Sequence, residues 1–221
     1  MEDSSITEVS KWRLGRGDMA YLVGIQIRAE DSVGFANEFE GWTKPLFMDL
    51  GATSARLSQT IYGSDQAGML LAAATFDSIQ TAAECEKNMN ADSRVKDTMA
   101  KVGAQRIGRS LLVVRSERGE LAGEYGSGLM ISSISQPTED EVQKMADDSW
   151  AIMGDHVNGI RQGQMIAAGE RTGMWVAGTY TDNLDDLMVG SANLFADPQT
   201  QQNMARFGNQ LVSRTLWRTL V

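Results

Sequence analysis

The sequence predicts an α+β protein in which two copies of one β-α-β-β-α-β unit close together into a single barrel. Residues 68–116 align with residues 173–221 without a gap. Thirteen of the 49 aligned pairs are identical, where average composition gives roughly 3 by chance. Strand-like and helix-like segments also follow one another in the same order in both copies. The repeat therefore reflects a fold used twice in one chain.

In each copy a strand and a helix precede a β-hairpin, and a helix in two pieces precedes the final strand. Strands are predicted from β-branched and apolar residues, and helices from apolar residues at helical spacing. The strands of the first copy are expected at 20–29, 52–63, 68–76 and 106–114. Those of the second copy are expected at 127–136, 157–169, 173–181 and 211–221. A further apolar strand at 6–14 is expected to pair with a sheet edge.

The ends of the helices give the clearest local signals. Thr138 and Glu141 form a capping-box pattern at the start of the first helix of the second copy. In the first copy Pro45 is expected to kink or end the corresponding helix, because proline has no N–H group. Asp92 and Asp197 occupy equivalent positions and are predicted to cap the second piece of the later helix.

Each β-α-β-β-α-β unit is a ferredoxin-like arrangement, with both helices on one face of a four-stranded sheet. The bare, partly apolar face needs a partner, and the other copy supplies it. We expect a first ferredoxin-like unit with an extra N-terminal strand at 1–119 and a second unit at 120–221. The boundary falls within 116–128, which is rich in Gly and Glu.

Composition excludes several classes of function. The net charge of -9 disfavours nucleic acid as a partner, since an acidic chain repels phosphates. No apolar run reaches the length of a membrane span, and the acidic N-terminus does not resemble a secretory signal. A single cysteine fits a reducing cytoplasm. One His and one Cys exclude a His/Cys metal cage, and no Asp/Glu loop has the spacing of a cation site.

The segments "FDSIQTAAE…NADSRV" and "TDNLDDLMV…FADPQT" resemble the helix starts of the dimeric α+β barrel superfamily. Within it, the chain looks like a tandem fusion of the antibiotic-biosynthesis-monooxygenase and NIPSNAP-like group. The resemblance implies a homodimer and a small-molecule pocket between sheet and helices. Members of the superfamily include cofactor-free monooxygenases, cyclases, isomerases, haem-degrading enzymes and proteins without known activity, so fold alone does not select a reaction.

His156 is the single group that titrates near neutral pH, and it is the candidate general base. The alternative is a His that caps the end of the preceding helix. Asn158 and Arg161 are candidate oxyanion partners. In a regular strand, His156, Asn158, Gln162 and Gln164 share one face, and Arg161 faces the other way. The density of polar residues in this strand suggests that it lines a cavity.

Arg56 and Arg161 are equivalent residues in mid-strand, and each could hold a carboxylate or enolate oxygen. The alternative is a salt bridge across the sheet or barrel, which their presence in both copies favours. Aromatic residues could wall the pocket, although tryptophans on helices are more often part of the core. The residues expected to bind substrate are Trp42, Arg56, Tyr62, Trp150, Gln164 and Trp175.

Two classes of function remain open. In the first, the chain is a cofactor-free monooxygenase, cyclase or isomerase that acts on a small aromatic or polyketide-like substrate, with catalytic residues His156, Asn158 and Arg161 and without metal. In the second, it is a non-catalytic ligand-binding or assembly module. A haem-binding or haem-degrading protein is a further alternative, with His156 as the one histidine that could hold the iron.

Overall fold

The computed structural model describes residues 19–221 of the chain. The strand expected at 6–14 lies outside the described residues, as does the beginning of the unit expected at 1–119. None of the helices in the described part is long and apolar enough to cross a membrane.

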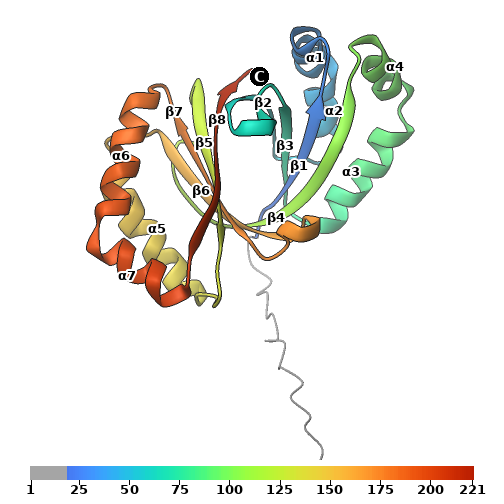
Figure 1. Ribbon diagram of the computed structural model, residues 1–221. Helices are drawn as coiled ribbons and strands as arrows, with labels where there is room; N and C mark the ends of the chain where they lie inside the picture. Colours follow the sequence, from blue (N-terminus) through green and yellow to red (C-terminus); the bar gives the residue numbers. More distant parts are fainter. Residues whose placement is uncertain (1–18) are drawn as a thin grey trace, which may run out of the picture.

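Eight antiparallel strands close into one barrel in the order β1-β3-β2-β8-β5-β7-β6-β4, which confirms the predicted α+β barrel (Figure 1). The strands are β1 (Tyr21–Arg28), β2 (Ser54–Tyr62), β3 (Leu70–Phe76), β4 (Gln105–Gly119), β5 (Tyr125–Ser132), β6 (Gly159–Ala167), β7 (Trp175–Thr181) and β8 (Gln210–Thr219). The helices are α1 (Ser32–Glu38), α2 (Lys44–Asp49), α3 (Ile79–Ala91), α4 (Ser93–Lys101), α5 (Glu139–Met153), α6 (Leu184–Ala196) and α7 (Pro198–Phe207).

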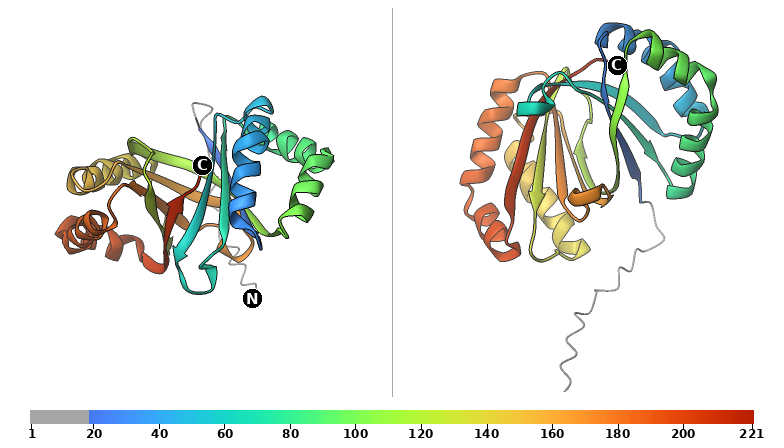
Figure 2. Two further views of the ribbon diagram at one scale, coloured as in Figure 1. Left: turned by 90° about the horizontal axis from the view of Figure 1, so that it is seen from above. Right: turned by 45° about the vertical axis from the view of Figure 1, so that its right-hand side comes forward.

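The two halves of the barrel have the same strand order, β4-β1-β3-β2 in the first and β8-β5-β7-β6 in the second. The pairs β2–β8 and β4–β6 join them. Figures 1 and 2 show α1 to α4 outside the first half and α5 to α7 outside the second. The inner faces of both halves therefore enclose one common space, which we call the lumen. β4 continues to Gly119, beyond the predicted end at 114, because it pairs with β6 along that whole length.

The predicted helix starts are present. Thr138 and Glu141 form the capping box, with Oγ1 of Thr138 accepting from the Glu141 N–H and the Glu141 carboxylate accepting from the Thr138 N–H. Asp92 accepts a hydrogen bond from the N–H of Arg94. Its equivalent Asp197 accepts one from the N–H of Thr200. These caps satisfy N–H groups that the first helical turn leaves without partners.

The helix around Pro45 does not end there. A π-helical turn, Phe39–Thr43, joins α1 to α2, and Pro45 lies at the start of α2. The Lys44 N–H donates to the Phe39 carbonyl across this wider turn. A π turn tolerates the missing N–H of proline without breaking the chain's helical path. It also changes which side chains of this segment face the sheet.

Candidate functional site

Cavities lie on both faces of the barrel wall in the described part of the chain. The lumen cavity, inside the barrel, has a volume of about 210 Å³. The first-half cavity, of about 60 Å³, lies between the first sheet and α1 to α4. The second-half cavity, of about 160 Å³, lies between the second sheet and α5 to α7. Ligand pockets usually measure roughly 300–1,000 Å³, so each of these spaces is smaller than a usual ligand pocket.

The first-half and second-half cavities occupy the same place in their respective halves. Residues at the repeat offset line both of them. These pairs are Ala72/Ala177, Met89/Leu194, Val95/Thr200, Thr98/Asn203, Met99/Met204 and Arg106/Leu211. Differences between the cavities are therefore differences between equivalent positions of the two halves.

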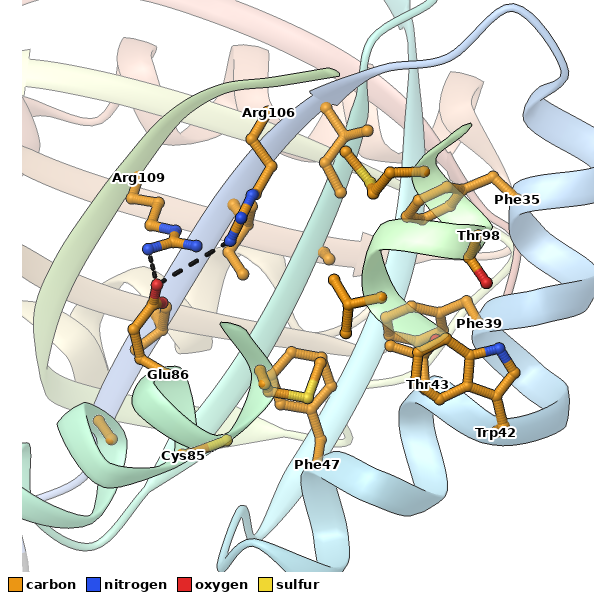
Figure 3. A pocket seen from close by; sticks show the side chains of 18 of the residues that line it. Phe35, Phe39, Trp42, Thr43, Phe47, Cys85, Glu86, Thr98, Arg106 and Arg109 are labelled. Atoms are coloured by element: carbon orange, nitrogen blue, oxygen red, sulfur yellow. Dashed lines mark ion pairs between the residues drawn. The ribbon is translucent and has the colours of Figure 1, made fainter. Parts of the chain in front are cut away.

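Aromatic side chains fill most of the first-half cavity (Figure 3). Phe35 comes from α1, and Phe39 and Trp42 come from the π-helical turn. At the mouth, the Glu86 carboxylate pairs with the guanidinium groups of Arg109 and Arg106. The remaining volume is small and almost entirely apolar, as expected of a packed core.

One thiol also faces the first-half cavity. Cys85 is 1% exposed, and burial raises the pKa of this thiol to about 11. The thiol is consequently neutral near pH 7 and is a poor nucleophile.

The second-half cavity is larger because its helix carries smaller residues. Asp31 and Thr138 are the N-caps of α1 and α5. Counted from these caps, the positions of Phe35, Phe39 and Trp42 correspond to Val142, Ala146 and Ser149. Val142 and Ser149 line the cavity. Two aromatic rings and an indole in one half are thus replaced by small side chains in the other.

Polar groups enter the second-half cavity from several elements. Gln162 on β6, Ser149 on α5 and Asn203 on α7 all line it. The repeat alignment contains the signal for Asn203, which replaces Thr98, but sequence reasoning did not use it. Asp148 also lines the cavity, and Lys144 pairs with its carboxylate at 2.7 Å. The cavity combines an apolar body with a few hydrogen-bonding groups, which is the composition of small-molecule sites.

Two of the residues expected to bind substrate meet at one end of this cavity. The Trp175 indole lines it, and its Nε1–H donates to Oε1 of Gln136 at 2.9 Å. Gln164 donates from Nε2 to the same Oε1, also at 2.9 Å. Gln164 is 1% exposed, and its Oε1 has no partner among the described residues. Gln164 therefore fixes Trp175 through Gln136 and does not itself line the cavity.

The two equivalent arginines line the lumen cavity instead. Arg56 and Arg161 both face it, while Gln162 faces the helices. Arg161 thus lies on the opposite face of β6 from Gln162, as the alternation of a strand predicts. Nε of Arg161 pairs with Glu117 at 2.6 Å, whereas the Arg56 guanidinium lies 4.8 Å from the centre of the Tyr180 ring.

The remaining predicted residues lie away from the three cavities. His156 follows α5 and packs against α6, so that a Cβ added at Gly190 would lie 2.8 Å from its Cβ. Asn158 donates to the Asp182 carboxylate at 2.8 Å and to the Ala122 carbonyl.

The last two predicted aromatics have surroundings of their own. Trp150 lies close to Gly119 and Gly154, where added Cβ atoms would meet its ring. Tyr62 ends β2 and is 67% exposed. Of the predicted pocket aromatics, Trp42 and Trp175 thus line cavities, and they do so in different halves.

The cavity linings do not fit a haem group. The usual axial ligands of haem iron come from His, Cys or Tyr, or from Met together with His. Among the described residues the second-half cavity has Met145 and Met204 but no His, Cys or Tyr. Cys85 lines the first-half cavity and Tyr180 lines the lumen cavity, but these spaces of about 60 and 210 Å³ are smaller than the roughly 300 Å³ of usual ligand pockets. His156 packs against α6 and lines none of the three cavities. Within residues 19–221, no three His, Cys, Asp or Glu side chains gather as a metal site.

Comparisons with solved structures define the class of fold. A candidate chlorite dismutase aligns with a TM-score of 0.57 and 9% identity, over 92% of this chain and 95% of that one. A candidate monooxygenase from Fusobacterium nucleatum aligns with the same score and 6% identity, over 92% of each chain. A haem-binding protein from Thermus thermophilus aligns with a TM-score of 0.57 and 11% identity, over 90% of each chain.

The chain therefore has the fold of the dimeric α+β barrels. No family model and no curated protein matches its sequence. At 6–11% identity the structural likeness defines the fold alone.

Proposed function

We propose that the protein binds a small, largely apolar molecule in the second-half cavity and that this binding, without chemical conversion, is its function. The single observation behind the proposal is the difference between two equivalent spaces. One measures about 60 Å³ and is closed by Phe39 and Trp42, and the other measures about 160 Å³ because small residues replace these rings. Packed cores have few voids, so an enlarged space lined with polar groups favours a ligand.

The lining indicates the chemistry of the ligand. Leu129, Met145 and Phe195 offer apolar contacts for a flat body, with the Trp175 indole as an aromatic wall. Oε1 of Gln162 accepts from the Ser116 hydroxyl at 3.1 Å, and its Nε2 can donate to one hydroxyl or carbonyl oxygen of the ligand. A small aromatic molecule with one such group matches this lining.

The catalytic version of the proposal has less support. A cofactor-free monooxygenase, cyclase or isomerase needs a base within hydrogen-bond reach of the substrate. His156 was the candidate, and it packs against α6 outside the cavity. Asp148 lines the cavity but is paired with Lys144. Asn158 is engaged with Asp182. These contacts favour the binding module over the enzyme.

The wider assignment is part of the same proposal. We place the chain with the antibiotic-biosynthesis-monooxygenase and NIPSNAP-like group, as a duplication of a ferredoxin-like unit with halves 1–119 and 120–221. The common strand order and the equivalent cavities support the duplication. We further propose a homodimer in a reducing compartment such as the cytoplasm. Light scattering would contradict the dimer by giving a 24.1 kDa particle at micromolar concentration.

Calorimetry with 2-naphthol and naphthalene tests the site. Ser149→Trp copies Trp42 into the second half and should abolish binding of both probes by filling the cavity. Ala151→Trp adds the same ring to an exposed position of α5 that does not line the cavity, and it should leave binding unchanged. Gln162→Leu should weaken 2-naphthol about tenfold and leave naphthalene unaffected, because it removes one hydrogen-bonding group.

Two results would refute the proposal. Binding that survives Ser149→Trp would place the ligand elsewhere in the molecule. The second result is conversion of an aromatic substrate by the wild type, with loss of this activity in a folded His156→Ala variant. It would support the enzyme hypothesis, with His156 as the general base.

A further inference from the structure

The lumen cavity has an unusual balance of charge. Arg56 and Arg161 line it in mid-strand, and Arg171 reaches it from the β6–β7 turn. Among the described residues no Asp or Glu lines this space. The whole chain is acidic, with a net charge of -9, so positive side chains gathered in one cavity cannot be explained by composition. Three partly buried arginines share one carboxylate partner in the described residues, Glu117 at Arg161, and this excess of positive charge favours an anion as a further partner.

The two mid-strand arginines reach across the lumen from opposite walls. Arg56, on β2, lies over the ring of Tyr180 on β7. Arg161, on β6, brings Nη1 to 3.4 Å from Oγ1 of Thr75 on β3. The Arg56 guanidinium thus ends at β7, the neighbour of the strand that carries Arg161. The Arg161 guanidinium ends at β3, the neighbour of the strand that carries Arg56. Both guanidinium groups consequently lie at one level of the barrel.

The rest of the lumen is apolar and aromatic. Along β6 the inward residue four positions after Arg161 is Met165, roughly 13 Å further on at the rise of a strand. Leu112 and Met130 line the same region. Near the arginines, Trp217 packs edge to face on Tyr180, with ring centres 6.1 Å apart.

Glycines in the neighbouring strand give this indole its room. A Cβ added at Gly126 would lie 2.5 Å from Trp217.

We infer that the lumen is a second binding site, separate from the second-half cavity, for a small monocarboxylate with a flat apolar body. The planar guanidinium fork matches the two oxygens of a carboxylate. The volume of about 210 Å³ suits a single-ring acid. Trp217, which lies near the arginines, packs on the ring, and Arg56 and Arg161 hold the charged end.

Glu117 sets the strength of this site. Its carboxylate pairs with Nε of Arg161 at 2.6 Å, and its side chain is 42% exposed against 16% for Arg161. A bound carboxylate competes with Glu117 for this guanidinium. Arg56 has no ion pair among the described residues, so it is the arginine that is ready to receive the ligand. Removal of the Glu117 charge should therefore strengthen binding, although the substitution lies outside the lining.

The experiment measures benzoate and its neutral analogue benzamide by calorimetry on the full chain. We expect the wild type to bind benzoate and to bind benzamide at least about tenfold more weakly. Arg56→Gln should weaken benzoate about tenfold or more, and Arg28→Gln, which removes the same charge from the exposed end of β1, should change it less than about twofold. Glu117→Gln should strengthen benzoate several-fold.

Folding of each variant is checked by circular dichroism. If Arg56→Gln does not fold, Arg56→Lys keeps the charge and removes the fork, and it should weaken benzoate while leaving benzamide unchanged. Equal affinity for benzoate and benzamide would overturn the inference, as would weaker binding in Glu117→Gln. Loss of benzoate binding in Ser149→Trp, with binding retained in Arg56→Gln, would place the acid in the second-half cavity and also overturn it.

Discussion

Replacing Phe39 by alanine tests whether aromatic residues close the first-half cavity. Phe39 is 1% exposed, and its ring packs against Phe47 with ring centres 6.2 Å apart. Truncation of a buried Phe costs about 3–5 kcal/mol of unfolding free energy. For a chain of this length each kcal/mol lowers the melting temperature by about 2–4 °C. We therefore expect the melting temperature to fall by about 6–20 °C.

The same variant should acquire a binding property. Without the ring, the first-half cavity becomes more like the second-half cavity, where Ala146 stands at the corresponding position. An apolar void of this kind takes up benzene. At a concentration of 100 times its dissociation constant, benzene should restore about 2.7 kcal/mol of stability.

The assay is thermal unfolding followed by circular dichroism, with and without benzene. Val33→Ala on α1, the helix just before the π-helical turn, is the control, because Val33 is 67% exposed and its truncation should cost less than about 0.5 kcal/mol. A loss below about 1 kcal/mol for Phe39→Ala would show that the ring does not fill this space. Absence of any effect of benzene would refute the argument from cavity size.

Two further substitutions and one labelling experiment test the surroundings of the sites. Hydrogen bonds from Asn158 and from the Glu124 N–H hold the pKa of the Asp182 carboxyl below its ordinary value of 3.8 in the folded state. The ionised carboxylate therefore stabilises the fold above about pH 3.8, and this stabilisation is lost as the pH falls through the lower pKa of the folded state. Asp182→Asn should therefore weaken the acid dependence of the melting temperature below about pH 4, and an unchanged profile would contradict the depressed pKa. Burial raises the pKa of the Cys85 thiol to about 11. A thiol reagent at about pH 8 should therefore label Cys85 after unfolding in denaturant and not in the native chain. Rapid labelling of the native chain would count against the burial of this thiol. Gly190→Ala would place a Cβ 2.8 Å from Cβ of His156 and should cost about 1–3 kcal/mol in denaturant unfolding. An unchanged midpoint would show that His156 does not pack there.

Much of the fold could be predicted because the same sequence pattern occurs in both halves of the chain. Asp92 and Asp197 predict the same helix start independently, and both cap it in the structure. Closure of the barrel was predictable from the uncovered face of a four-stranded sheet. The course of the helix around Pro45 was not, because a π turn depends on how Phe39 and Trp42 pack against the sheet and leaves no fixed pattern in sequence.

The sites were harder to predict than the fold. Alternation along β6 correctly separated Arg161 from Gln162, but it could not say which face contained a cavity. His156 attracted attention by its chemistry alone, and its contact with α6 depends on a glycine 34 positions later in the chain, at Gly190. Composition identifies groups able to react, whereas packing between distant segments decides which of them meet a ligand.

The arrangement of the barrel in two halves explains why the two kinds of cavity differ. Each helix-covered cavity belongs to one half, so substitutions such as Phe39 to Ala146 change one of them and leave the other intact. The lumen is common to both halves, and equivalent residues must share it. Arg56 and Arg161 are such a pair, and so are the groups that they touch, Tyr180 and Thr75. Two like charges in one enclosed space repel each other unless an anion accompanies them. Glu117 supplies one carboxylate at Arg161, and the lumen around Arg56 has room for a second.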